Sequence, residues 1–93
     1  MAERIEMSFE SRTPKSRAIE ERGLASLPIV SSRGNSHHFP YPLTIARASG
    51  AHLWDVDGQC YIDLINNMYS LVHGNAFEPI NEAVRKQLEH GTV

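Results

Sequence analysis

The clearest pattern of hydrophobic and polar positions lies in residues 52–65, which read HLWDVDGQCYIDLI. Two apolar runs flank Asp57-Gly58, a dipeptide that readily takes the positive φ angles of a type I′ turn. The pattern therefore predicts a hairpin that turns at Asp57-Gly58. Together with the apolar run before it, it predicts an antiparallel meander of three strands, at residues 43–48, 51–55 and 59–64.

A helix is predicted on each side of this meander. Thr13-Pro14 is a typical helix start, because threonine can cap free N–H groups and proline is tolerated at the first helical position. This helix is expected to end at Arg22, before Gly23. A second helix is predicted to start at Pro79 and to end before Gly91. Its stripe of apolar and long side chains is Ile80, Ala83, Val84, Gln87 and Leu88.

The remaining segments carry no regular pattern. Residues 1–12 have no sustained period and are predicted to be a flexible N-terminus. Residues 27–42 are rich in proline, glycine and serine, which predicts a long ordered loop. Two helices and a small meander offer little apolar surface to one another. The chain is therefore expected either to dock on other chains or to be the front piece of a larger protein.

Composition narrows the class of protein. The 93 residues are 41% hydrophobic and 22% charged, with a net charge of −2, which is ordinary for a water-soluble domain. The chain has no apolar run near the roughly 18 residues that span a bilayer and no clustered basic face, so neither a membrane nor a nucleic acid is an expected partner. Cys60 is a single cysteine and the polar start lacks a secretory signal, so the expected location is the cytoplasm.

Few residues have the spacing of a reactive or metal-binding site. Asp55, Asp57 and Gly58 resemble part of a calcium loop, but Asn66 stands where its bidentate glutamate belongs, which favours turn-forming aspartates. Cys60 fits a strand position for a small apolar residue better than the position of a nucleophile. No metal site is predicted from the five histidines, which lack ligand spacing: His37, His38, His52, His73 and His90.

Three polar positions remain open to two interpretations. Arg33, beside Gly34 and serines, can present its planar guanidinium to a carboxylate or phosphate, or simply be solvated. Asp63 is a carboxylate on a predicted strand, and the simpler interpretation is a solvent-facing or paired group. Gly74-Asn75 can expose backbone N–H groups to a ligand or merely form a turn.

The string PLTIARASGAHLWDVDGQCYIDLINNMYSLVHGNAFEPINEAVRKQLEHGT resembles the N-terminal segment of the class III, pyridoxal-phosphate-dependent aminotransferases. This group contains the ω-transaminases and glutamate-1-semialdehyde aminomutase. The matching motifs are the W-D-x-D-G-x-x-Y-I-D hairpin, a glycine before a proline-led helix and a Gly-Thr at the end of that helix. The preceding loop, SSRGNSHHFPYPLTIAR, is similar to that of the β-amino-acid transaminases and the aminomutases.

The resemblance implies an α/β fold class. Residues 13–93 would be the N-terminal segment of a fold-type-I pyridoxal-phosphate-dependent transferase, with helix, long loop, meander and helix but without the catalytic large domain. Such segments pack on the large domain and on the second subunit of a homodimer. Pyridoxal 5'-phosphate is the implied cofactor of the full-length protein, held by a lysine that neither Lys15 nor Lys86 resembles.

Two residues are implied to bind substrate. Arg33 occupies the position of the arginine that grips the substrate carboxylate in the β-amino-acid branch, and Tyr69 lies in the segment that contributes to the substrate pocket. One departure stands nearby, because many relatives have Gly-His with three residues between the glycine and the helix proline. Here Gly74 is followed by Asn75, and four residues precede Pro79, so the local loop is expected to differ in shape.

The expected activity is that of a transaminase or aminomutase, which moves an amino group between an amino acid and a keto acid. This segment alone is predicted to be inactive and to hold no catalytic residue. Two alternatives remain. One is a non-catalytic adaptor that docks on a partner through the stripe of Ile80, Val84 and Leu88, and the other is one chain of a split enzyme.

Overall fold

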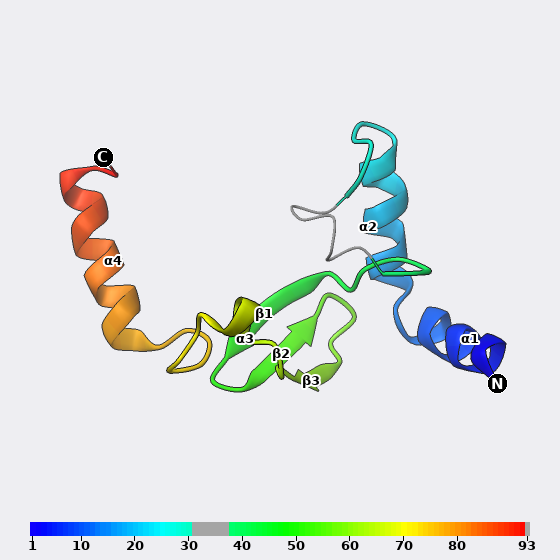
Figure 1. The fold of residues 1–93 in the computed structure, drawn as a ribbon. Helices are drawn as coiled ribbons and strands as arrows, with labels where there is room; N and C mark the ends of the chain where they lie inside the picture. The colour runs from blue at the N-terminus through cyan, green and yellow to red at the C-terminus, as the bar shows by residue number, and fades with distance from the viewer. Residues whose placement is uncertain (31–37, 93) are drawn as a thin grey trace. The chain divides into compact units, whose positions relative to one another are not determined.

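The structure is a computed structural model that describes residues 1–30 and 38–92 (Figure 1). The elements are α1 (Ala2–Arg12), α2 (Pro14–Leu24), β1 (Ile45–Ser49), β2 (His52–Asp55), β3 (Cys60–Ile62), α3 (Asn66–Tyr69) and α4 (Glu78–His90). The strands form one sheet in the order β1-β2-β3, which confirms the predicted meander with slightly shorter strands. Backbone contacts divide the chain into two compact units, residues 1–46 with 54–59 and residues 47–53 with the chain from Cys60 onward.

The turn of the β2-β3 hairpin differs from the prediction. Gly58 has φ +90°, but Asp57 is not among the residues with positive φ, so the predicted type I′ turn is wrong. The Asp55 carboxylate accepts the backbone N–H groups of Asp57 at 3.0 Å and Gln59 at 2.8 Å. The turn is built around the Asp55 side chain and needs only one residue in the left-handed region, which is Gly58. Longer hairpin loops likewise place a glycine at such a position.

In the first unit, the N-terminus of α2 is capped by a distant residue. The two carboxylate oxygens of Asp57 accept the backbone N–H groups of Lys15 at 3.0 Å and Ser16 at 3.2 Å. These amides have no partner inside the helix, and a negative charge at this end is favoured by the helix dipole. The side chain of Gln59 donates to the carbonyl of Arg12 at 2.6 Å, so the hairpin loop also binds the end of α1.

The expectation that Thr13 caps α2 with its side chain is wrong. Its hydroxyl bonds instead to the carbonyl of Phe9 at 2.8 Å and to the hydroxyl of Tyr41 at 2.9 Å. Ser16, fully buried, accepts the backbone N–H of Thr44 at 3.2 Å. The segment that holds Tyr41 is thereby bonded to the junction between the two helices.

Two helix boundaries in this unit also differ from the pattern. Within residues 1–12, where no element is predicted, Ala2–Arg12 forms α1, which is in contact with Tyr41 through Phe9 at a ring centroid distance of 5.2 Å. The flexibility of this segment stays a prediction. The expected stop at Gly23 is wrong, since α2 continues to Leu24. A Cβ at Gly23 would lie 2.5 Å from the Val30 side chain, so glycine permits a close approach there.

Buried side chains in the described residues are mostly polar. Tyr41, 5% exposed, is the only buried hydrophobic residue among them, whereas Thr13, Ser16, Glu20 and Asp55 are all buried. Hydrogen bonds therefore position these segments more than an apolar core does. No helix in the described ranges has both the length and the apolar character needed to cross a membrane.

In the second unit, α4 confirms the predicted helix closely. It covers Glu78–His90 and ends at Gly91, whose φ of +101° suits a residue without a Cβ. Its outer surface carries ion pairs from Arg85 to Glu78 and Glu82. The apolar stripe is half-exposed, with Ile80, Val84 and Leu88 at 52%, 51% and 57%.

Replacing Asp57 with alanine is expected to destabilise the chain by about 1 to 2 kcal/mol, because Lys15 and Ser16 lose the acceptor of their amide groups. Denaturant unfolding measures the loss, and amide exchange should show faster exchange at these two positions. The matched control is Glu6→Ala, which removes an exposed carboxylate from α1. Equal stability of the two variants would contradict the capping role.

Candidate functional site

The chain after β3 turns in the left-handed sense at four consecutive residues. Asn66, Asn67, Met68 and Tyr69 have φ of 50°, 49°, 59° and 68°. Asparagine tolerates this region, but for other residues with a side chain it costs about 1 to 2 kcal/mol each. Such a conformation persists only where surrounding contacts impose it, and it is concentrated at functional sites. These four residues are the segment labelled α3, which is therefore not a regular right-handed helix, and we call them the left-handed turn.

Asp63 holds the start of this turn. Its Oδ1 accepts the backbone N–H groups of Ile65 at 3.0 Å and Asn66 at 2.8 Å, and its Oδ2 accepts the side-chain N–H of Asn75 at 2.9 Å. The bond from Asn75, followed by the backbone N–H of Asn66, lowers the pKa of the Asp63 carboxyl below its ordinary value. The ionised form is the one that accepts all three bonds.

Asn75 is in turn fixed to the β1-β2 turn. Its backbone exchanges two hydrogen bonds of 2.8 Å with Gly50, and its side chain also donates to the carbonyl of Gly50 at 3.2 Å. A Cβ at Gly74 would lie 2.9 Å from the Gly50 carbonyl oxygen, so only glycine allows this approach. Asp63 contacts the same turn through its backbone N–H, which donates to Ala51 at 2.8 Å. Three segments therefore meet at one carboxylate.

The structure places only one of the two predicted substrate-binding residues. Tyr69 ends the left-handed turn with its side chain 81% exposed, beside Met68 at 53%. Its backbone N–H donates to the carbonyl of Ile65 at 2.8 Å, so the backbone is held while the ring stays uncovered. Arg33 lies outside the described residues.

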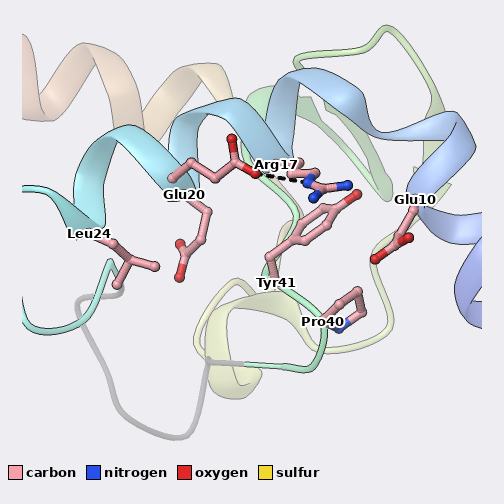
Figure 2. A pocket seen from close by; sticks show the side chains of 7 residues that line it. Glu10, Arg17, Glu20, Leu24, Pro40 and Tyr41 are labelled. Carbon is pink, nitrogen blue, oxygen red and sulfur yellow. Dashed lines mark hydrogen bonds and ion pairs between the residues drawn. The ribbon is translucent and has the colours of Figure 1, made fainter.

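A hollow of about 230 Å³ lies in the first unit (Figure 2). Figure 2 shows the side chain of Arg17 beside Tyr41. The Arg17 guanidinium donates a hydrogen bond to the Glu21 carboxylate at 2.9 Å. This hydrogen bond raises the pKa of the Arg17 guanidinium above its ordinary value. The hollow is lined by Glu10, Arg17, Glu20, Glu21, Leu24, Pro40 and Tyr41. Three carboxylates surround one guanidinium, so an anion such as a phosphate is disfavoured there.

Neither lysine is placed to hold pyridoxal phosphate. Lys15 lies at the exposed start of α2, and Lys86 lies on α4 with a side chain 71% exposed and 3.8 Å from Glu82. Neither lines the hollow. The described residues thus do not fit the cofactor, and no chemical step is assigned to them. Over the same ranges, no group of three histidine, cysteine or acidic residues is arranged to hold a metal ion.

The aspartates of the hairpin have structural partners. The Asp55 carboxylate bonds to backbone N–H groups of the hairpin turn, which confirms the turn-forming interpretation for this residue. Asp57 bonds instead to the start of α2. Asp63 is a paired carboxylate, as the simpler interpretation has it. Sequence reasoning missed its partner Asn75, twelve residues away, because no local pattern encodes that contact. The pair Asn66-Asn67 was an available signal for the left-handed turn, since asparagine is enriched there.

Comparison with known proteins gives a consistent result. Residues 32–93 match the family described as aminotransferase class III. The chain is similar to the β-phenylalanine transaminase of Variovorax paradoxus, with 36% identity over 89% of the chain and 19% of that relative. It is also similar to the glutamate-1-semialdehyde 2,1-aminomutase of Methanocaldococcus jannaschii, with 42% identity over 58% of the chain and 13% of that relative. The chain thus spans about a fifth or less of the length of these relatives.

Solved structures agree with the sequence matches. A β-phenylalanine aminotransferase structure from Variovorax paradoxus gives a TM-score of 0.85 at 35% identity, over 92% of this chain and 20% of that one. A structure described as a transaminase with PLP bound gives 0.80 at 39% identity, over 86% of this chain and 19% of that one. The arrangement of the described residues is therefore that of an N-terminal part of this fold.

Replacing Asn75 with alanine is expected to raise the pKa of the Asp63 carboxyl, because the largest cause of its depression is removed. The pKa of Asp63 lies below the roughly 3.9 of an unfolded aspartate, so its stabilising bonds are present above that pH and are lost as the pH falls through the folded value. A carbon-detected NMR titration of Asp63 measures the shift. Asn81→Ala, on α4, is the control, and an unchanged pKa in Asn75→Ala would contradict the pairing.

Proposed function

Because the chain belongs to the class III aminotransferase family, we propose that it is the N-terminal part of a pyridoxal-phosphate-dependent transaminase or aminomutase. Its substrate is a carboxylate-bearing amino compound, and the amino group passes between an amino acid and a keto acid. The single observation that carries this proposal is the joint match in sequence and backbone over about nine tenths of the chain.

In this proposal the residues described above have no role in bond making. Pyridoxal phosphate, when bound, supplies the electron sink of the reaction. The lysine that holds it belongs to another part of the protein, since Lys15 and Lys86 lie on exposed helix surfaces. The segment is inactive alone and contributes one wall of the substrate site.

Two residues form the substrate contacts of that wall. Arg33 binds the substrate carboxylate, because a guanidinium presents two parallel N–H donors that match the two oxygens. Tyr69 contacts the remainder of the substrate, and its support is geometric. Its ring is exposed, and its backbone lies in the left-handed region, a conformation that is concentrated at functional sites.

The assembly proposed is a homodimer in the cytoplasm. The exposed stripe of α4, with Ile80, Val84 and Leu88, supports packing against further protein surface. The same stripe favours a second candidate function, in which the chain is an adaptor or one half of a split enzyme that docks on a partner. The two candidates differ in the length of the polypeptide that contains this segment and in whether that polypeptide binds pyridoxal phosphate.

Purification of the natural protein, followed by intact mass and absorbance, distinguishes them. The transaminase proposal expects a polypeptide several times longer, with the absorbance of protein-bound pyridoxal phosphate at about 400–430 nm that changes on addition of an amino donor. Removal of the cofactor by dialysis against a carbonyl-trapping amine is the control. A long protein without this absorbance would contradict the transaminase, and a 10.4 kDa species would favour the adaptor or split enzyme.

In the cofactor-loaded enzyme, Arg33→Ala is expected to raise KM for the amino acid substrate about 10- to 100-fold, because a charge-assisted hydrogen-bonded pair is lost. Arg33→Lys should raise it less, since the charge remains while the paired donors are lost. An amine without a carboxylate should be unaffected, and Arg22→Ala on α2 is the matched control. Equal losses with both substrates would show that Arg33 does not bind the carboxylate.

A further inference from the structure

The left-handed turn is closed by its own hydrogen bonds and held at its start by Asp63. Its internal bonds run from Tyr69 to Ile65 at 2.8 Å and from Ser70 to Asn66 at 3.0 Å, both between backbone groups. Ser70 adds a side-chain bond to the carbonyl of Asn67 at 2.8 Å. These bonds close the turn but do not fix its direction. Side-chain hydrogen bonds to the Asp63 carboxylate join the start of the turn, at the backbone N–H groups of Ile65 and Asn66, to the end of β3.

Asp63 can fix this direction because it is itself held. Its Oδ2 faces the Asn75 amide at 2.9 Å, and Asn75 is bonded to Gly50 through its backbone and its side chain. The Asp63 carboxylate therefore connects the left-handed turn to the segment of Asn75, which the close approach of Gly74 to Gly50 holds against the β1-β2 turn. Because Asp63 accepts hydrogen bonds from the turn and is itself held by Asn75, it fixes the position of the turn as well as contributing to stability.

We propose that Asp63, anchored by Asn75, is a positioning residue that fixes Tyr69 for its contact with the substrate. This inference rests on the proposed function, in which Tyr69 touches the substrate. Asp63 itself touches no reacting group, because both its oxygens are used inside the protein. Its contribution is to the affinity for the substrate, since a displaced tyrosine loses binding whether or not the chemistry is altered.

The test is a set of variants in the full-length, cofactor-loaded enzyme. Asp63→Asn presents N–H donors to the Asn75 amide and breaks the anchor, so KM for the amino acid should rise about 10-fold while kcat changes less than about 3-fold. Asn75→Asp opposes two carboxylates and should raise KM at least as much. Asn81→Ala, on α4, is the control and should leave both constants unchanged.

The double variant Asp63→Asn with Asn75→Asp restores the pair with donor and acceptor exchanged. The amide oxygen at position 63 still accepts from the turn, and its N–H group now donates to the carboxylate at position 75. KM is expected to return most of the way to its original value. The Asn75→Asp single variant and the double variant share the contact of the carboxylate at position 75 with the Gly50 carbonyl, so their difference reports the pair alone. A double variant whose KM is no lower than that of Asn75→Asp would contradict the pairing.

Measurements in the Tyr69→Ala variant distinguish the substrate contact of Tyr69 from the positioning role of Asp63. Tyr69→Ala should raise KM by itself, and Asp63→Asn should then add no further increase, because its effect acts through the tyrosine. If Tyr69→Ala raises KM but Asp63→Asn does not, or if the two effects add in full, the positioning role is wrong and the substrate contact stands. If Tyr69→Ala leaves KM unchanged, both are wrong.

Binding of a non-reacting carboxylate analogue, measured by calorimetry, gives a readout that is independent of turnover. The dissociation constant should follow KM across the variants. Where Asp63→Asn fails to fold, Asn75→Ala takes its place, because it removes the anchor and leaves the bonds from Asp63 to the turn intact. Wild-type affinity in a folded Asn75→Ala enzyme would overturn the proposal.

Discussion

The free amide N–H groups at the start of α2 find their acceptor in the carboxylate of Asp57, more than forty residues further along the chain. A helix normally takes this cap from the residue just before it, but the Thr13 hydroxyl is bonded to Phe9 and Tyr41. The position of α2 therefore depends on the hairpin loop, and so does everything bonded to α2. In the first unit, where Tyr41 is the only buried hydrophobic residue among those that the structure describes, the Asp57 carboxylate joins segments that little apolar packing holds together.

Asp63 plays the corresponding part in the second unit, six residues after Asp57. Each of these carboxylates accepts two backbone N–H groups, from the distant start of α2 in the case of Asp57 and from the next residues of the chain in the case of Asp63. The W-D-x-D-G-x-x-Y-I-D motif is thus a structural device with a distinct acceptor for each unit. Its acidic residues are used in holding backbone, which explains why the hairpin has the regularity of a functional motif and yet no reactive group.

Elements encoded by nearby residues were predictable, and elements held by distant ones were not. The strands and α4 follow from local alternation, a helical stripe and a glycine at the end. α1 has only weak amphipathic character, and its contact with Tyr41 joins residues 32 positions apart. The cap of α2 and the partner of Asp63 are likewise long-range bonds that leave no local pattern. For the site, Tyr69 came from the family resemblance, whereas the backbone that holds it came only from the structure.

The identity of residue 75, which bonds to Asp63, determines whether this hydrogen bond depends on pH. The class III pattern often has a histidine after the glycine that precedes the last helix, and here the position is Asn75, which donates to both Asp63 and Gly50. A histidine changes its charge between pH 5 and 8, whereas an amide does not titrate. The bond that fixes the left-handed turn is therefore independent of pH until Asp63 itself is protonated, below its ordinary pKa.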